Sequence, residues 1–269
     1  KGQFYTPAEV SRLMAKLIGI SKLPSDHKNV SIYDPTCGSG SLLLRARAEA
    51  KCDVSVNGQE MDLATIGMAK MNMILHGEWA ADLQHDDVLN YPQHKIDDNH
   101  LQQFDFIVAN PPFSQKEWLM SGHDKDNFGR WSSELLPPNG NGDMAFLMHI
   151  IKSLKPGGNA AVILPHGVLF RGGREADIRK KIIDEVDSQT NREKPLAGLK
   201  IVVDAGNGAG GFYATKILEP LGADVSASQF LEPEGSFPNH APNPENKEAM
   251  ASICRRVVES GADLGLIFD

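Results

Sequence analysis

Short apolar runs alternate with amphipathic stretches along residues 1–184, a pattern typical of an α/β protein with a parallel sheet. The apolar runs predict strands at 30–33, 54–58, 83–89, 104–109 and 160–164. Apolar residues at helical spacing predict helices at 41–50, 63–75, 144–154 and 176–184, with Asp143 as the cap of the third. A first helix is expected to begin at Thr6-Pro7-Ala8-Glu9, with Thr6 as its cap and Pro7 in its first turn.

The pattern changes near residue 185. Residues 185–195 are polar and show no periodicity, which predicts a linker. A second series follows, with strands expected at 201–204, 225–228 and 264–268 and helices at 212–221 and before Gly261. We therefore expect a core at 1–184, a linker at 185–195 and a small βαβαβ lobe at 196–269. The apolar face of the helix before Gly261 is predicted to be Met250, Ile253, Cys254, Val257 and Val258.

Composition narrows the class of protein. Apolar residues make up 41% and charged residues 23%, which is ordinary for a soluble globular chain. No apolar run is long enough to cross a bilayer, and the first residues lack a targeting pattern. Neither the cysteines nor the histidines show metal-binding spacing. We therefore expect a reduced, cytoplasmic protein without disulfides, bound metal or membrane association.

The charge is unevenly distributed along the chain. Residues 1–184 carry 20 Lys and Arg against 22 Asp and Glu, a net charge of −2. Residues 185–269 carry 7 against 13, which gives −6 of the total of −8. The first part has no basic stripe that could hold DNA phosphates by itself. If DNA is the substrate, much of the affinity must come from another domain or subunit.

The segment Asn110-Pro111-Pro112-Phe113 directly follows the predicted strand 104–109. Ligands bind beyond the carboxyl ends of strands in open parallel sheets, so this is a suitable place for chemistry. The Asn110 side-chain oxygen and a proline carbonyl could both accept hydrogens from the amino group of adenine, a poor nucleophile because its lone pair is delocalised. Phe113 offers a flat face for a flipped-out base. The structural alternative is a strand that ends in a Pro-Pro turn.

A glycine loop, Asp34-Pro35-Thr36-Cys37-Gly38-Ser39-Gly40, lies between the first predicted strand and its helix. Glycines let the backbone approach a ligand, and the start of the helix supplies free N–H groups. Glu60 follows the next strand, where an acidic residue would hold a ribose diol. The loop and the acid together favour a nucleotide-like cofactor over a plain strand–helix turn.

Residues 1–184 resemble the modification subunit of type I restriction-modification systems, a family of adenine-specific DNA methyltransferases. The matching segments are GQFYTP (2–7), DPTCGSGSLL (34–43), NPPF (110–113), GDMAFLMHIIKSLKPGG (142–158) and AAVILPHGVLFRGGREADIRKK (160–181). The resemblance implies a Rossmann-like core that transfers a methyl group from S-adenosylmethionine to the exocyclic amine of adenine in DNA. It also implies separate specificity and restriction subunits as partners. We expect residues 1–184 to lack the last two strands of such a sheet. The implied target-base residues are Asn110, Pro111, Pro112 and Phe113. The expected cofactor residues are Gln3, Phe4, Tyr5, Thr6, Pro7, Asp34, Thr36, Cys37, Gly38, Gly40, Glu60 and Asp87.

The sequence from residue 199 onward resembles a different family, the second domain of phosphohexomutases. The matching segments are LKIVVDAGNGAGGFYATKILEPLGADV, EPEGSFPNHAPNPEN and SGADLGLIFD. That family uses a phosphoserine and a magnesium loop with several aspartates. The phosphoserine segment is missing here, and Asp269 would be the first aspartate of the loop. We therefore expect a chimeric chain whose second part is a mutase-like fragment without mutase activity.

Three alternatives stay open. A methyltransferase of the same fold could act on RNA guanine or on a glutamine side chain of a protein, although GQFYTP and GVLFRGGREADIRKK favour DNA. The second part could instead be the functional one and bind a phosphosugar. The chain could also fold and be inactive, since a sheet without its last strands leaves an edge exposed.

Overall fold

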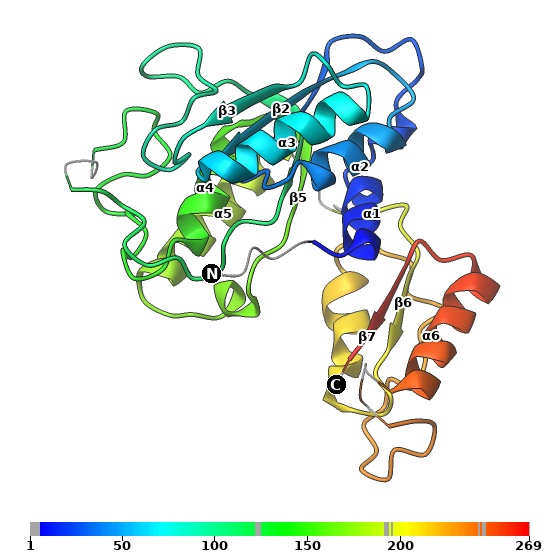
Figure 1. The fold of residues 1–269 in the computed structure, drawn as a ribbon. Helices are drawn as coiled ribbons and strands as arrows, with labels where there is room; N and C mark the ends of the chain where they lie inside the picture. The colour runs from blue at the N-terminus through cyan, green and yellow to red at the C-terminus, as the bar shows by residue number, and fades with distance from the viewer. Residues whose placement is uncertain are drawn as a thin grey trace. The chain divides into compact units, whose positions relative to one another are not determined.

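The computed structural model describes residues 6–121, 125–190, 194, 196–241, 243 and 246–268, without the side chains of 184–190. The chain divides into two compact units, Lys1–Gln189 and Thr190–Asp269 (Figure 1). The first contains a parallel sheet of five strands in the order β3-β2-β1-β4-β5. These strands are β1 (Val30–Asp34), β2 (Val54–Glu60), β3 (Asp82–His85), β4 (Phe104–Ala109) and β5 (Leu154–Val162).

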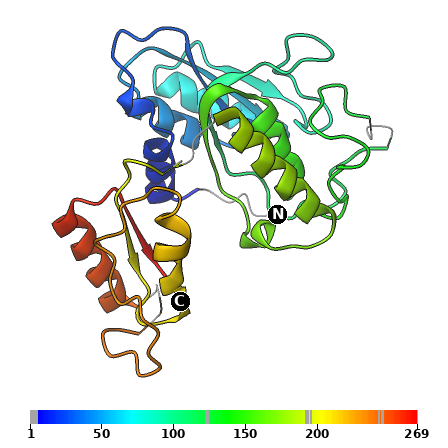
Figure 2. The same cartoon turned by 180° about the vertical axis from the view of Figure 1, so that it is seen from behind.

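Helices cover both faces of this sheet. Figure 1 shows α2 (Ser41–Glu49) and α3 (Leu63–Leu75) in front of the strands, and Figure 2 shows α4 (Asp143–Lys152) and α5 (Arg174–Thr190) from behind. The first helix, α1 (Ala8–Leu17), packs on α2 and precedes a 3₁₀ turn, η1 (Ile20–Lys22). A second 3₁₀ turn, η2 (His166–Leu169), lies between β5 and α5.

The central strands are buried on both faces because each face meets helices. Ile32 and Val108 belong to a core cluster with residues of α1, α2 and α3. Their neighbours Tyr33 and Ile107 point to the opposite face, where they cluster with Ile150 of α4. Strand order reverses between β1 and β4, which are neighbours in the sheet. Such a switch point is where open parallel sheets bind ligands.

Several predicted elements of the first unit are confirmed, and others need correction. Strand 104–109 and helix 63–75 have the predicted bounds. The third strand is shorter than expected and ends at His85. β5 begins at Leu154 rather than at the predicted residue 160, because a register shift in its pairing with β4 takes residues 155–158 into the strand. The expected helix end at Asp184 and the start of the linker at residue 185 are wrong, since α5 continues to Thr190.

The second unit contains two parallel strands, β6 (Ile201–Asp204) and β7 (Leu264–Ile267). Figures 1 and 2 both show these strands between α6 (Lys247–Ser260) and the helical segment that contains η3 (Ala209–Gly211) and a π-helical turn, η4 (Ala214–Leu218). The predicted strand at 225–228 does not form. Its flanking residues instead make single bridges, Lys200 with Asp224 and Asp204 with Gln229.

Helix α6 ends as expected at Gly261, which adopts the left-handed conformation with φ of 62°. Its predicted apolar face is only partly correct. Ile253 is buried and Val257 packs beside it, but Val258 is 81% exposed. Met250 and Cys254 are also exposed. The buried face is narrower than the sequence suggests because it covers only two strands.

Candidate active site

The glycine loop after β1 is tied to the end of β2 by backbone hydrogen bonds. The Cys37 N–H donates to the Gln59 carbonyl over 2.9 Å, and the Gly38 N–H donates to Glu60 Oε2 over 3.0 Å. Gly38 has φ of 53°, and a Cβ at this position would meet open space. The loop therefore presents bare backbone at the carboxyl edge of the sheet, where a ligand can approach it closely.

Glu60 joins two loops at this edge. Its second oxygen, Oε1, accepts the Asp62 N–H over 2.9 Å, so the carboxylate is held from both sides. A carboxylate has about four acceptor sites, and these two bonds leave room for further donors. Next to it, Asp86 follows β3 and donates its N–H to the Glu60 carbonyl. The sequence offered no reason to single out Asp86.

Asp87 is more fully engaged than its predicted role suggests. Its Oδ1 accepts the Leu89 N–H over 3.0 Å, and its Oδ2 accepts from Asn90 Nδ2 over 2.6 Å. The carboxylate thus shapes the turn after β3. The structure places Asp87 at the same sheet edge as Glu60, two residues beyond His85, the β3 residue paired with Glu60.

Within the glycine loop, Asp34 and Cys37 are buried. Asp34 accepts the Thr36 N–H over 2.9 Å. Burial, with the charge of Glu60 as a smaller cause, raises the pKa of the Asp34 carboxyl to about 7. Burial also raises the pKa of the Cys37 thiol well above its usual value, which keeps the thiol protonated. Gly40 has φ of 77°, a left-handed conformation that favours glycine.

Asn110 follows β4, directly beside the β1 edge. Its Nδ2 donates to the Thr6 hydroxyl over 2.9 Å, although the two residues are 104 positions apart. In this orientation no described residue hydrogen-bonds to its Oδ1. Thr6 therefore does not cap the first helix as predicted: Pro7 takes the cap position, and no side chain caps the helix. Beyond Asn110, Pro111 is buried whereas Pro112 and Phe113 are exposed.

The residue after Phe113, Ser114, is held by Asp143, which was predicted to be a helix cap. Asp143 does not cap α4 as predicted, because Gly142 takes the cap position. The Asp143 carboxylate instead accepts the Ser114 N–H over 2.7 Å and a hydrogen bond from Arg171 Nη1 over 2.8 Å. Both partners are distant in sequence, so local helix rules could not reveal them. The available signal was that GDMAF and FRGGRE both belong to the matched segments.

Comparison with known protein families identifies the family of the first unit. Residues 1–190 match the family described as N-6 DNA Methylase. The chain belongs to this family. Among its relatives, the type I restriction enzyme MjaIX methylase subunit of Methanocaldococcus jannaschii is 33% identical over 193 residues, covering 68% of this chain and 32% of the relative. The chain thus spans about a third of the length of that relative.

A solved structure supports the fold assignment of this family member. The type I restriction-modification methyltransferase subunit from Streptococcus thermophilus is 38% identical, with a TM-score of 0.59. The similarity covers 68% of this chain and 39% of that one. The sheet and helices described above therefore form the α/β fold of such methyltransferase subunits, as predicted.

The second unit matches a different family, which bears out the predicted chimera. Residues 179–269 match the α/β/α domain II of phosphoglucomutase and phosphomannomutase. A phosphomannomutase/phosphoglucomutase of Pseudomonas syringae is 51% identical over 71 residues, which is 26% of this chain and 15% of that protein. The two family matches overlap within α5.

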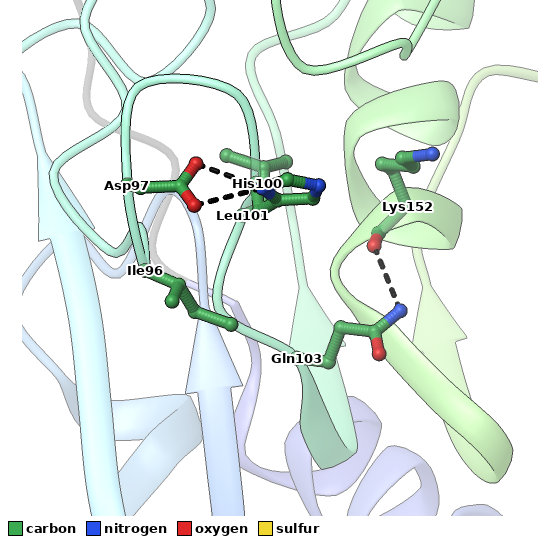
Figure 3. A pocket seen from close by; sticks show the side chains of 6 residues that line it. All are labelled: Ile96, Asp97, His100, Leu101, Gln103 and Lys152. Carbon is green, nitrogen blue, oxygen red and sulfur yellow. Dashed lines mark hydrogen bonds and ion pairs between the residues drawn. The ribbon is translucent and has the colours of Figure 1, made fainter.

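Some predicted features lie outside the described residues, namely Gln3, Phe4, Tyr5 and Asp269. Among the residues that are described, no group of three or more His, Cys, Asp or Glu could hold a metal ion, and no helix is long and apolar enough to span a membrane. A surface hollow lies at the opposite, amino end of β4 and is therefore remote from Asn110 (Figure 3). It is lined by Ile96, Asp97, His100, Leu101, Gln103 and Lys152.

Proposed function

We propose that the first unit binds S-adenosylmethionine at the ends of β1 and β2 and transfers its methyl group to the exocyclic amine of adenine in DNA. The observation that carries this proposal is the juxtaposition at the switch point. The glycine loop follows β1 and Asn110 follows β4, and these two strands are neighbours. A cofactor site and a target-base site would therefore share one sheet edge.

The residues at this edge fit the cofactor. Gly38 leaves open space where a side chain would otherwise stand. Glu60 keeps free acceptor sites for a ribose diol, and Asp86 and Asp87 lie next to it. These carboxylates give the edge a negative potential, which favours a cationic ligand. When bound, S-adenosylmethionine supplies a methyl group already activated by a positively charged sulfur.

The work left to this chain is alignment and activation of the amine. Oδ1 of Asn110, to which no described residue hydrogen-bonds, accepts a hydrogen from the amine and favours a more tetrahedral nitrogen with an available lone pair. The carbonyl of Pro111 or Pro112 can accept the second hydrogen. Phe113, which is 52% exposed, offers its ring to a base turned out of the duplex.

We further propose that the chain works with a specificity subunit and a restriction subunit in the cytoplasm. The names of the relatives, which are methylase subunits of type I restriction enzymes, support this assignment. The charge of residues 1–184 supports it as well, because 20 basic against 22 acidic residues provide little attraction for DNA. A separate subunit would then supply sequence recognition and phosphate contacts.

Calorimetric titration with S-adenosylmethionine tests the cofactor site. Glu60→Ala should weaken binding at least tenfold while leaving the unfolding transition in place, because a ribose acceptor is lost. Glu219→Ala, an exposed acid in the second unit, is the matched control and should bind like the parent chain. Unchanged affinity in Glu60→Ala would refute the placement of the ribose.

Transfer of labelled methyl from S-adenosylmethionine tests the substrate. Duplex DNA, RNA and a glutamine-containing protein substrate are offered in parallel, followed by identification of the modified group. Label in N6-methyladenine is the expected result. Label in RNA guanine or in a glutamine side chain, with none in DNA, would replace the proposed substrate by one of its rivals.

A further inference from the structure

The segment from Asn110 to Ser114 is suspended between two fixed points. At its start, Asn110 follows β4 and donates to Thr6. At its end, Ser114 donates its N–H to Asp143, over 2.7 Å. Ser114 has φ of 51°, a left-handed conformation that a non-glycine residue rarely adopts without support from its surroundings. The Asp143 carboxylate provides that support.

Other contacts bring the same stretch onto the start of α4. The Gly142 N–H donates to the Gln115 carbonyl over 2.9 Å. Gly142 also lies against Trp118, since a Cβ there would stand 3.2 Å from two Trp118 side-chain atoms. Backbone contacts next to the Asp143–Ser114 hydrogen bond therefore hold Asp143 in place. Its position at the N-terminus of α4 also favours its negative charge.

Asp143 is 1% exposed, so its charge needs a partner. Arg171 provides it, with Nη1 at 2.8 Å from Asp143 Oδ2 and at 3.5 Å from Glu175 Oε1. The path of Arg171 requires a glycine four residues earlier, because a Cβ on Gly167 would lie 2.6 Å from Arg171 Nε. The Arg171 N–H in turn donates to the Gly167 carbonyl over 2.9 Å.

We propose that Asp143 and Arg171 are positioning residues for methyl transfer: they fix Ser114 and so hold Asn110 and Phe113 where the target base must lie. This inference rests on the proposed function, because it presumes that the segment receives a base. Neither side chain is assigned any contact with the base or the cofactor. Their loss should therefore lower the rate of transfer and leave cofactor binding intact.

The first experiment measures the anchor itself, without any substrate. Hydrogen–deuterium exchange of the full chain is followed in peptides covering 104–109 and 110–119. In Asp143→Ala, exchange of the Ser114 amide should rise at least tenfold, whereas β4 keeps its protection. Unchanged exchange at Ser114 would overturn the proposal. Asp143→Asn keeps an acceptor oxygen for the Ser114 amide and is the matched control, so exchange at Ser114 should stay close to that of the parent chain. If Asp143→Ala fails to fold, the same exchange is measured in Arg171→Ala, in which Asp143 loses its charged partner and exchange at Ser114 should also rise.

The second experiment measures function. Arg171→Ala should lower kcat for transfer to DNA at least tenfold, with the Kd for S-adenosylmethionine within twofold of the parent chain. Arg171→Lys, which keeps the charge, should recover most of the rate. Arg174→Ala is the matched control, because this exposed arginine bonds only to the Leu136 carbonyl among its described contacts.

The possible outcomes distinguish a failure of the positioning role from a failure of the proposed function. A normal kcat in Arg171→Ala, with an active parent chain, would overturn the positioning role and leave the methyltransferase assignment standing. A parent chain that binds S-adenosylmethionine but methylates no DNA would instead refute the proposed function, and the positioning role with it. The exchange experiment would still show whether Asp143 holds Ser114.

Discussion

The amide of Asn110 has two ends with opposite hydrogen-bonding character, and only the oxygen can accept from an amine. Thr6 accepts from the nitrogen end over 2.9 Å, which turns Oδ1 away from this contact and leaves it for a ligand. The hydroxyl of Thr6 thus holds the nitrogen end of the Asn110 amide in this structure. Helix α1 begins without a side-chain cap, because Pro7 occupies the cap position.

Asn110→Ala should lower the rate of methyl transfer by about 10²–10³-fold, the usual effect of removing one preorganised hydrogen-bonding group from an active site. The affinity for S-adenosylmethionine should stay within twofold, because the proposed partner of Asn110 is the adenine amine. Single-turnover transfer and calorimetry on the same preparations measure the two quantities. A comparable transfer rate in the variant would disprove the role assigned to Asn110.

Thr6→Val should reduce transfer by about fivefold, since the loss of one neutral hydrogen bond is worth about 1 kcal/mol. The isosteric methyl group cannot accept from the amide nitrogen, so the Asn110 side chain would no longer be fixed by this contact. Thr6→Ser keeps the hydroxyl and should restore the rate. Equal rates in all three chains would mean that Thr6 does not orient Asn110.

Asp34 should make stability depend on pH in the absence of cofactor. Its pKa is about 7 in the fold, above the usual value of 3.8, so the folded chain keeps a proton that the unfolded chain loses. Its contribution to stability is therefore complete below about pH 4 and is lost as the pH rises through 7. Asp34→Asn, which cannot ionise, should gain about 2–3 kcal/mol relative to the parent chain between pH 5 and pH 8.

Urea unfolding at a series of pH values measures this difference. Asp26→Asn, at an exposed aspartate of the same unit, provides the control and should track the parent chain at every pH. A constant gap between Asp34→Asn and the parent chain would show that Asp34 titrates alike in both states.

At the scale of elements, strands buried on both faces were predictable because their apolar runs are continuous, as in 104–109. Elements that depend on tertiary contacts were not. Residues 155–158, which follow the predicted helix 144–154, lie within β5 because its pairing with β4 includes them through a register shift. Segment 225–228 alternates apolar and polar residues as a strand would, yet it pairs only at its two flanks.

In the candidate site, too, features set by local sequence were predictable and features set by tertiary contacts were not. The glycine loop, Glu60 and Asn110 could be located because each follows a predictable strand. Asp143 and Arg171 could not be linked from sequence, since the carboxylate bridges residues 29 positions upstream and 28 downstream of it. Local capping rules assigned both Thr6 and Asp143 to helix starts, whereas the fold uses each in a long-range contact.

The packing of α6 on β7 depends on one small residue. A Cβ on Gly265 would lie 2.6 Å from Val257 Cγ2 and 3.0 Å from Ile253 Cγ1. Gly265→Ala should therefore destabilise the second unit by about 1–3 kcal/mol through overpacking. Faster hydrogen–deuterium exchange in α6 would report this change. Gly235→Ala, at a position with open space, should leave exchange in α6 unchanged.

Tryptophan fluorescence offers an internal reference for that experiment. Trp79, Trp118 and Trp131 all belong to the first unit. Their unfolding transition should be the same in Gly265→Ala and the parent chain, because the clash affects the core of the other unit. An α6 that keeps its full protection in Gly265→Ala would contradict the packing described here.

At the scale of the whole molecule, two families meet in one chain, and charge differs between the parts. Residues 1–184 carry a net −2 and residues 185–269 a net −6. DNA binding draws much of its free energy from release of counterions when Lys and Arg neutralise phosphates. A chain with a net charge of −8 provides little of that free energy.

This 269-residue chain should therefore bind duplex DNA weakly by itself, with a Kd above about 10 µM at 0.15 M salt, in the range of non-specific binding. Fluorescence anisotropy of a labelled duplex between 0.05 and 0.3 M salt measures both the affinity and its salt dependence. The logarithm of the binding constant should fall with the logarithm of salt at a slope of about −3 or shallower, since few phosphates are neutralised. Because methyl transfer needs only transient contact, the activity proposed for Asn110 should appear at high DNA concentration even so. Submicromolar affinity with a steep salt slope would show that the first unit gathers its basic residues into a DNA-binding surface, and that no separate subunit is needed to hold the substrate.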